Sequence, residues 1–261
     1  MMRVWYSTSE WVVRRKTIAG ETIGFVPTMG ALHRGHAALV ERCRRENDVA
    51  VVSLFVNPTQ FNDPRDLDRY PRTMEQDLAL LESLGVDDVI TPGVPDFYPK
   101  GYRFRIEPPP DLLVMEGVFR PGHLQGVLTV VMKLLNLARA DRAYFGEKDY
   151  QQLQVVTEMA REFFTVTEIV PCATVREESG LAESSRNRLL SPEGRTKAAL
   201  LYRALSTAAS ATDAAAMLEA QGFRVEYVEE HWGRRLAAVY LEGVRLIDNV
   251  AIEGGRDVTH S

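Results

Sequence analysis

The sequence has few cysteines, no long apolar run and little net charge. Cys43 and Cys172 are the two cysteines among 261 residues. They are too few and too far apart for a disulfide framework or a four-ligand zinc site, so we expect buried thiols in a reducing cytoplasm. No stretch approaches the roughly 20 apolar residues that span a bilayer, which argues against export or membrane insertion. A net charge of −5 gives no basic field for a polyanion, so we expect no nucleic-acid partner.

The chain does contain strand-like and helix-like segments in alternation. It is 45% hydrophobic, which is enough for a substantial core. The β-branched run over residues 49–56 is typical of an interior parallel strand. The alternation predicts an α/β fold with a Rossmann-like, doubly wound and mainly parallel sheet. We expect strands over 22–26, 49–56, 88–91, 142–145 and 168–175, and helices from about 36 and over 74–84, 122–137 and 150–163.

The pattern changes after about Arg176. Alanine-rich helices are expected over 192–210 and 213–220, and β-like runs over 224–228 and 236–247. Helices followed by strands suggest a small α+β domain. We therefore predict a catalytic Rossmann-like domain over residues 1–176 and a small C-terminal α+β domain over residues 177–261.

One segment lies where a strand ends and a helix begins, the ligand-binding position of an open α/β sheet. Backbone N–H groups at such a helix start favour phosphate, and Gly30 and Gly35 permit close backbone approach. His33 and His36 can both donate to phosphoryl oxygens, which suits charge developing on an α-phosphate. The alternative is a turn with a surface or zinc-binding histidine pair, although two histidines make an incomplete metal site. The segment reads Pro27-Thr28-Met29-Gly30-Ala31-Leu32-His33-Arg34-Gly35-His36.

The motif His33-x-Gly35-His36 resembles the nucleotide-binding signature of class I aminoacyl-tRNA synthetases and nucleotidyltransferases. With Pro27 to Gly30 and Leu32 included, the string is similar to that of the pantoate–β-alanine ligase family. The resemblance continues in order through six further segments, at residues 55–61, 68–72, 120–123, 145–153, 184–187 and 245–249.

This resemblance implies an ATP-dependent ligase that condenses pantoate with β-alanine through a pantoyl adenylate, releasing AMP and pyrophosphate in pantothenate biosynthesis. It implies ATP with Mg²⁺, pantoate and β-alanine as the small-molecule substrates. It also implies a homodimer, and the apolar run over residues 49–56 would permit one if it exposed a strand edge. The first domain would bind ATP and pantoate, and the second would be lid-like.

Amide and basic side chains form the expected acid-binding group. Asn57 and Gln60 follow the second predicted strand, where uncharged amides can bond the hydroxyl and carboxylate groups of a small acid. An ordinary Asn-Pro turn is the alternative for Asn57. The resemblance implies that Gln60 and Gln152 hold pantoate and that β-alanine approaches Gln60. The full set expected to bind pantoate is Met29, Asn57, Gln60, Arg120, His123 and Gln152.

Two further loops are expected to bind ATP. Gly146-Glu147-Lys148-Asp149 follows a short strand and precedes a helix, so its backbone and the Lys148 ammonium can bind phosphate. A capped helix with a solvated charge cluster is the alternative. Glu183-Ser184-Ser185-Arg186 resembles the mobile phosphate-binding loop of the family, with a hydroxyl-rich linker as the alternative. Val175 completes the ATP set.

Glu183 departs from the family, which usually has an apolar residue there. A carboxylate against phosphate is repulsive. We therefore expect Glu183 to contact ATP only through its backbone, with its carboxylate turned outward or paired with a nearby arginine. Asp77, together with Glu75, could help to hold Mg²⁺ through water. Gln76 stands where the family often has an acid, and a solvated helix face is the alternative.

The expected catalytic residues are His33, His36, Lys148 and Arg186, with His36 as the proton donor. One competing hypothesis is a nucleotidyltransferase that attacks a nucleoside triphosphate with a phosphate ester. The other is a regulatory nucleotide-binding module without turnover, and the retention of Gln60, Gln152 and His36 argues against it.

Overall fold

The structure is a computed structural model that describes residues 1–62 and 64–252. These residues form two compact units. The first comprises Met1–Glu147 and Gln151–Cys172, and the second comprises Lys148–Tyr150 and the chain from Ala173 onward. The chain therefore enters the second unit briefly at Lys148 before it returns to the first.

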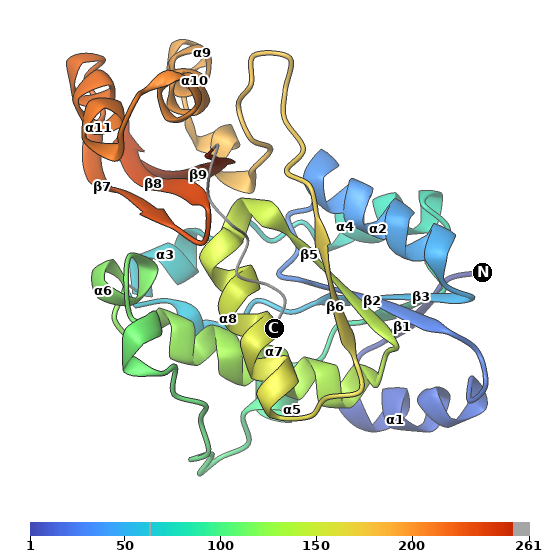
Figure 1. Cartoon of the computed structure of the whole chain (residues 1–261). Helices are drawn as coiled ribbons and strands as arrows, with labels where there is room; N and C mark the ends of the chain where they lie inside the picture. Colours follow the sequence, from blue (N-terminus) through green and yellow to red (C-terminus); the bar gives the residue numbers. More distant parts are fainter. Residues whose placement is uncertain (63, 253–261) are drawn as a thin grey trace. The chain divides into compact units, whose positions relative to one another are not determined.

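The first unit is built on a six-stranded sheet in which every pair of neighbours is parallel, in the order β1-β4-β3-β2-β5-β6 (Figure 1). The predicted doubly wound parallel sheet is confirmed. All six residues of β3 are buried, as expected for a strand covered on both faces. The strands are β1 (Arg3–Trp5), β2 (Ile23–Thr28), β3 (Val49–Leu54), β4 (Asp88–Ile90), β5 (Arg142–Gly146) and β6 (Glu168–Cys172).

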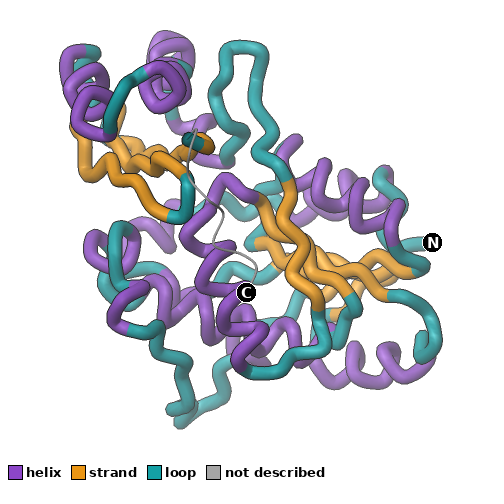
Figure 2. Tube along the Cα trace, viewed as in Figure 1, coloured by secondary structure: helices purple, strands orange, loops and turns teal. Residues whose placement is uncertain are grey.

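Helices cover both faces of this sheet (Figures 1 and 2). Leu39 of α2 and Leu81 of α4 are buried in one apolar cluster with Val26 and Val52 of the sheet. On the other face α1 meets α7, where Trp11 Nε1 donates to the carbonyl of Leu137 at 2.8 Å. The helices are α1 (Thr8–Thr17), α2 (Arg34–Glu46), η1 (Pro58–Gln60), α3 (Pro64–Arg69), α4 (Met74–Ser83), α5 (Val94–Phe97), η2 (Pro110–Leu112), α6 (Glu116–Phe119), α7 (His123–Ala138), η3 (Glu147–Asp149) and α8 (Tyr150–Glu162).

Two expectations for the first unit are wrong. β3 pairs with β2 on one side and with β4 on the other, so residues 49–56 offer no strand edge to a second copy. The strand expected over residues 168–175 ends at Cys172, where the chain passes into the second unit. Both thiols are free and buried, as predicted.

The second unit is a small α+β structure, as predicted, with an antiparallel sheet in the order β7-β8-β9. The single run expected over 236–247 is wrong, because a turn at Glu242-Gly243 divides it into two strands. Both turn residues have positive φ, 52° and 76°, as tight hairpins require. The elements are η4 (Ser185–Leu189), α9 (Pro192–Ala198), α10 (Leu200–Thr207), α11 (Ala211–Ala220), β7 (Arg224–His231), β8 (Arg234–Leu241) and β9 (Val244–Ala251).

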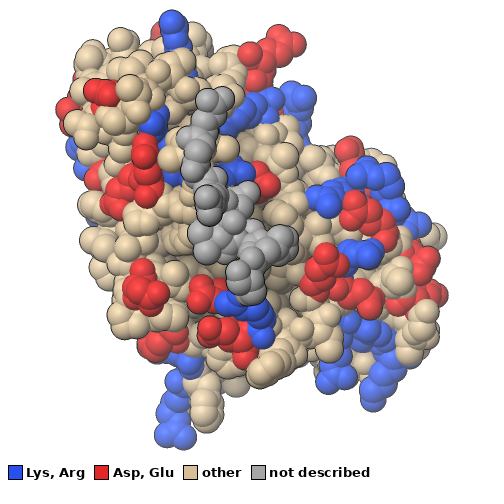
Figure 3. All heavy atoms as spheres, viewed as in Figure 1, with Lys and Arg blue, Asp and Glu red and all other residues tan. Residues whose placement is uncertain are grey.

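Lys and Arg side chains are interspersed with Asp and Glu on the face drawn in Figure 3, in keeping with a net charge of −5. That face therefore presents mixed charge rather than one continuous basic surface. Within residues 1–62 and 64–252, none of the helices combines the length and the apolar character that crossing a bilayer requires.

Candidate functional site

The predicted nucleotide segment lies at the switch point of the parallel sheet. The chain runs from β2 through β3 to β4 on one side, whereas β5 and β6 lie on the other side of β2. Ligands of open α/β sheets bind outside the carboxyl ends of the strands at such a point. Pro27 and Thr28 end β2, and the residues from Met29 to Leu32 form the turn that leads to α2.

Hydrogen bonds and left-handed backbone shape this turn. Thr28 donates its hydroxyl to the carbonyl of Ser53 at 2.8 Å and accepts from the amide of Gly30 at 3.2 Å. Gly30 has φ of 78° and Ala31 has φ of 52°. Glycine adopts this conformation without cost, but alanine there needs support from its surroundings. Arg34, the first residue of α2, is exposed.

His33 and His36 lie together at the start of α2, with ring centroids 4.0 Å apart. His33 is the N-cap residue, and its Nδ1 accepts from the amide of Gly35 at 3.1 Å. The Nδ1 of His36 accepts from the amide of His33 at 3.4 Å. A ring nitrogen that accepts an N–H carries no proton, so these contacts assign each neutral imidazole its proton on Nε2. Both rings thus have the donor that a phosphoryl oxygen needs.

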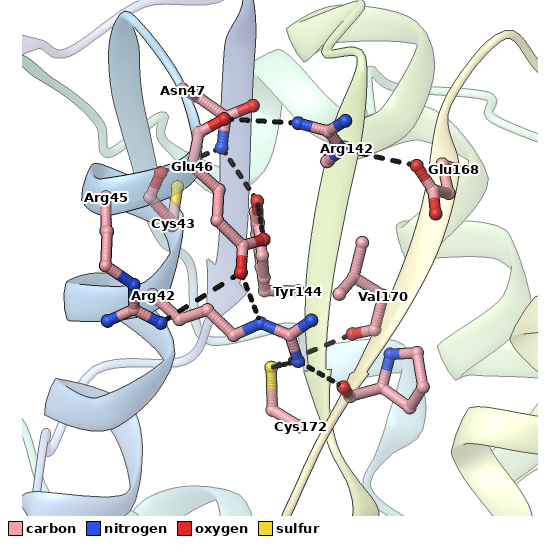
Figure 4. A network of polar contacts seen from close by, with 11 residues as sticks. Arg42, Cys43, Arg45, Glu46, Asn47, Arg142, Tyr144, Glu168, Val170 and Cys172 are labelled. Carbon is pink, nitrogen blue, oxygen red and sulfur yellow. Dashed lines mark hydrogen bonds and ion pairs between the residues drawn. The ribbon is translucent and has the colours of Figure 1, made fainter.

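A polar network holds the other end of α2 (Figure 4). Asn47 donates to the carbonyl of Cys43 at 2.8 Å and to the hydroxyl of Tyr144 at 2.7 Å. Tyr144 in turn donates to Glu46 at 3.0 Å, and Arg42 donates to the same carboxylate at 2.9 Å. Burial raises the pKa of Tyr144 to about 12 and that of Cys43 to about 12. The bond from Arg42 lowers the pKa of Glu46. The helix that carries the histidine pair is thereby anchored to β5.

Asp77, one of the residues expected to hold Mg²⁺, is 4% exposed and accepts from the turn after β2. Its Oδ2 accepts from the amide of Ala31 at 2.9 Å, and its Oδ1 accepts from the amide of Leu32 at 2.8 Å. Glu75 and Gln76 are exposed on the same helix. Among the described residues, no three His, Cys, Asp or Glu side chains are grouped as a protein-built metal site would need.

Asn57 and Gln60 are brought together after β3. Asn57 is the N-cap residue of η1, and its Nδ2 donates to Gln60 Oε1 at 3.0 Å and to the carbonyl of Gly126 at 3.1 Å. Its Oδ1 accepts from the hydroxyls of Thr59 and Tyr98. Because Oε1 of Gln60 accepts from Asn57, Nε2 is left as the donor of that amide. Asn57 therefore orients Gln60.

Arg120, directly after α6, and His123, the first residue of α7, support the same residue. His123 is 7% exposed, and its Nδ1 lies 2.9 Å from the carbonyl of Gln60. Its Nε2 lies 3.1 Å from Nη1 of Arg120, which also donates to Glu116 at 3.2 Å. The guanidinium can only donate and the carbonyl can only accept, so the proton of His123 belongs on Nδ1. Four of the six residues expected to bind pantoate thus form one connected group.

The other two predicted acid-binding residues are half-buried, Met29 directly after β2 and Gln152 in the first turn of α8. The neighbouring Gln151, which the sequence did not single out, is 4% exposed. Gln151 accepts from the amide of Glu116 and donates to the carbonyls of Leu112 and Val114. A pair of adjacent glutamines at a helix start gives no signal as to which one is structural.

The second unit contains a pocket lined by Lys148, Ser184 and Arg186. Ser184 is the N-cap residue of η4 and accepts from the amide of Arg186 at 3.3 Å. Ser185 is half-buried in the same turn. The residues that line the pocket are Lys148, Leu181, Ala182, Ser184, Arg186, Asn187, Leu201, Arg245, Leu246, Ile247 and Asp248. Two of the predicted catalytic cations and one predicted hydroxyl therefore share one pocket.

The other residues of the predicted Lys148 loop lie on two elements. Gly146 is the last residue of β5, and Glu147 and Asp149 belong to η3.

Buried residues of β9 hold the backbone of Lys148. Asn249 is 2% exposed, and its Nδ2 donates to the carbonyl of Lys148 at 3.0 Å. Its Oδ1 accepts from Arg234 at 2.9 Å. The neighbouring Asp248 takes two bonds from Arg176, at 2.7 and 2.9 Å. The motif at 245–249 had no predicted role, and the structure gives it this supporting one.

Glu183 and Val175 face each other across a short hairpin in the second unit. The amide of Glu183 donates to the carbonyl of Val175 at 2.9 Å. The Glu183 carboxylate lies close enough to Arg195 to help raise the pKa of that guanidinium, although the hydrogen bond from Arg195 to Glu177 contributes most. An arginine is therefore close to the carboxylate that departs from the family pattern.

The chain matches the family described as pantoate-beta-alanine ligase over residues 2–251. It is 52% identical over 252 residues to the pantothenate synthetase of Bdellovibrio bacteriovorus, covering 97% of this chain and 100% of that protein. The pantothenate synthetase structure from Thermus thermophilus is 45% identical, with a TM-score of 0.89 and coverage of 96% of this chain and 99% of that one. The pantoate-beta-alanine ligase from Francisella tularensis, complexed with beta-gamma ATP and beta-alanine, has a TM-score of 0.91 at 40% identity, covering 96% and 98%.

Proposed function

As a member of the pantoate–β-alanine ligase family, this chain condenses pantoate with β-alanine using ATP, and we propose that the reaction passes through pantoyl adenylate. A free carboxylate does not acylate an amine at neutral pH, because oxide is a poor leaving group. In the first step a pantoate carboxylate oxygen attacks the α-phosphorus, and the bond to the pyrophosphate oxygen breaks. In the second step the amine of β-alanine attacks the acyl carbon, loses a proton and displaces AMP.

The observation that carries this proposal is the histidine pair at the switch point. Contacts to Nδ1 assign Nε2–H to His33 and to His36, so both rings can donate to the α-phosphate as negative charge builds up there. Donors that are already oriented by backbone contacts need no reorganisation during the reaction. His36 is proposed as the proton donor. The segment from Pro27 to His36 binds the nucleotide.

The acid is proposed to bind at Gln60, whose amide is oriented by Asn57. Its Nε2 is a suitable donor to a carboxylate or hydroxyl oxygen of pantoate, and β-alanine is proposed to approach the same side chain. Gln152 and Met29 complete the acid site. Direct contact of Asn57, Arg120 and His123 with pantoate stays a prediction, beside the supporting contacts that they make to Gln60.

Lys148, Ser184, Ser185 and Arg186 are proposed to bind the triphosphate, with Val175 and the backbone of Glu183 completing the nucleotide contacts. Lys148, Ser184 and Arg186 line the same pocket of the second unit, and this grouping of two of the predicted cations with a hydroxyl supports the assignment. ATP is proposed to act with Mg²⁺, which needs only one or two carboxylates beside phosphate oxygens and water. Because the described residues include no ready-made cluster of ligands, the phosphates would hold most of the ion.

Two assays test this function. Pyrophosphate release should require pantoate, and AMP release should require β-alanine as well. His36→Ala and Lys148→Ala should each remove most pyrophosphate release from a folded protein, whereas Arg45→Ala, an exposed change near the far end of α2, should not. Near-normal adenylate formation in the first two variants would remove those residues from catalysis. Pyrophosphate release at the same rate with and without pantoate would refute the acid-activating step and favour a nucleotidyltransferase.

A cytoplasmic homodimer is also proposed, on the family resemblance. Sedimentation of the purified chain at micromolar concentration tests the dimer, and a species of 29.3 kDa would contradict it. The lid-like role of residues 177–261 stays a prediction.

A further inference from the structure

The buried carboxylate of Asp77 binds the turn that precedes the histidine pair. Asp77 lies in the first turns of α4, 45 residues beyond Leu32 in the sequence. Its two oxygens accept from successive amides, those of Ala31 at 2.9 Å and of Leu32 at 2.8 Å. A third donor, the hydroxyl of Thr73, reaches Oδ2 at 3.0 Å. With 4% exposure, this carboxylate depends on the protein rather than on water for its partners.

The turn has a particular need for such acceptors. Gly30 and Ala31 both have positive φ, and left-handed backbone at a non-glycine residue persists only where its surroundings hold it. A Cβ at Gly30 would lie 3.0 Å from Oδ2 of Asp77, so the carboxylate also packs closely against the turn. The α4 helix start that carries Asp77 favours negative charge at this point. One side chain thus satisfies two amides of the strained turn.

We propose that Asp77 is a positioning residue that fixes the turn from which His33 and His36 project. His33 follows Leu32 directly, so a rotation of the amides of Ala31 and Leu32 would move the N-cap of α2 and both imidazoles. The proposal deepens the function proposed above and rests on it. This role differs from that of a metal ligand, because the carboxylate binds backbone amides of the turn and affects ATP only through the position of the two histidines.

Asp77→Asn is the sharpest perturbation, because it keeps the size of the side chain and replaces one acceptor oxygen with an NH₂ donor. Whichever oxygen is replaced, the new NH₂ group would face the N–H of Ala31 or of Leu32, and that backbone amide would have to turn away. Glu82→Gln, the same chemical change at an exposed position of α4, is the matched control. Each variant is assayed for pantoate-dependent pyrophosphate release over a range of Mg²⁺ concentrations, with circular dichroism to confirm folding.

The expected result for folded Asp77→Asn is a loss of about 100-fold in turnover, with an unchanged Mg²⁺ concentration at half-maximal rate. Normal turnover would overturn the proposal, and so would activity restored by excess Mg²⁺, which would identify a metal ligand. Hydrogen exchange of the Ala31 and Leu32 amides gives a readout besides activity. Protection should fall at both amides in Asp77→Asn and stay normal in Glu82→Gln, and unchanged protection in Asp77→Asn would overturn the proposal.

If Asp77→Asn fails to fold, Thr73→Val provides the second test. It removes one of the three donors to Asp77 and should lower turnover by about threefold to tenfold, with faster exchange at the amide of Ala31. If both turnover and exchange at the amide of Ala31 are unchanged in Thr73→Val, the proposal is overturned. A wild-type protein without pantoate-dependent pyrophosphate release would instead refute the proposed function, and the exchange measurement would still report on the contacts of Asp77.

Discussion

Gly126→Ala should damage the acid site although it favours the helix. Gly126 lies inside α7, where alanine is preferred over glycine by about 1 kcal/mol. A Cβ there would lie 2.4 Å from the carbonyl oxygen of Thr59 and 2.7 Å from Cα of Gln60, whereas ordinary contact begins near 3.4 Å. Both are backbone atoms, so η1 would have to move by about 1 Å. Overpacking, together with strain in the hydrogen bond from Asn57 to the carbonyl of Gly126, should outweigh the gain in helix propensity. We expect a net loss of about 1–3 kcal/mol in the free energy of unfolding.

The functional effect should fall on the acid. A shift of about 1 Å in Gln60 should lower turnover with pantoate by about 100-fold, while ATP affinity measured by calorimetry stays close to that of the wild type. Urea unfolding gives the stability change. Asn136→Ala, at an exposed position of the same helix, is the control and should leave both activity and stability nearly unchanged. A Gly126→Ala protein with normal pantoate dependence would refute the reasoning that the approach of α7 sets the position of Gln60.

Three further outcomes are expected. Because the pKa of Tyr144 is raised to about 12 in the folded protein, its contribution to stability is complete below pH 10 and is lost as pH rises from 10 to 12. Tyr144→Phe should weaken that alkaline decline in urea unfolding, and an identical pH profile would contradict it. Asn249→Ala removes the bond to the carbonyl of Lys148 and should raise the KM for ATP several-fold while lowering stability by about 1–3 kcal/mol; an unchanged KM would exclude the supporting role. Glu183→Gln should leave the KM for ATP within about twofold, because the carboxylate is expected to lie near Arg195 rather than against phosphate, and a large fall in KM would place that charge against phosphate.

Long elements with clear periodicity could be predicted from the sequence, and short or closely joined ones could not. The β-branched run that became β3 is buried at every position, so its pattern was informative. The boundary between β8 and β9 could not be predicted, because Glu242-Gly243 is neither Asn-Gly nor Asp-Gly, the usual sequence signals for a two-residue hairpin. The brief passage of Lys148–Tyr150 into the second unit depends on tertiary packing, which no local pattern encodes.

For the candidate site, residue types could be predicted from the sequence but the contacts that orient them could not. The histidine motif and the amides after β3 were recognised from their positions at strand ends. The sequence predicts Asp77 as an acid that could help to hold Mg²⁺ through water, whereas its partners in the structure are amides 45 and 46 residues away in the sequence. Asn249 belongs to the motif at residues 245–249, but the sequence gives no chemical role for it, because its partner Lys148 lies 101 residues earlier. Long-range pairings of this kind become visible only in three dimensions.

The two ring nitrogens of His33 and of His36 have different roles, so a substitution can remove one role and keep the other. Nδ1 accepts from a backbone amide, and Nε2 carries the proton that is proposed to bond the substrate. An asparagine side chain has an acceptor near the position of Nδ1 but reaches no further, whereas a glutamine can extend a donor toward the position of Nε2. His33→Asn would thus preserve the bond that caps α2 while removing the Nε2 donor. This single substitution would then give an inactive enzyme with an intact fold.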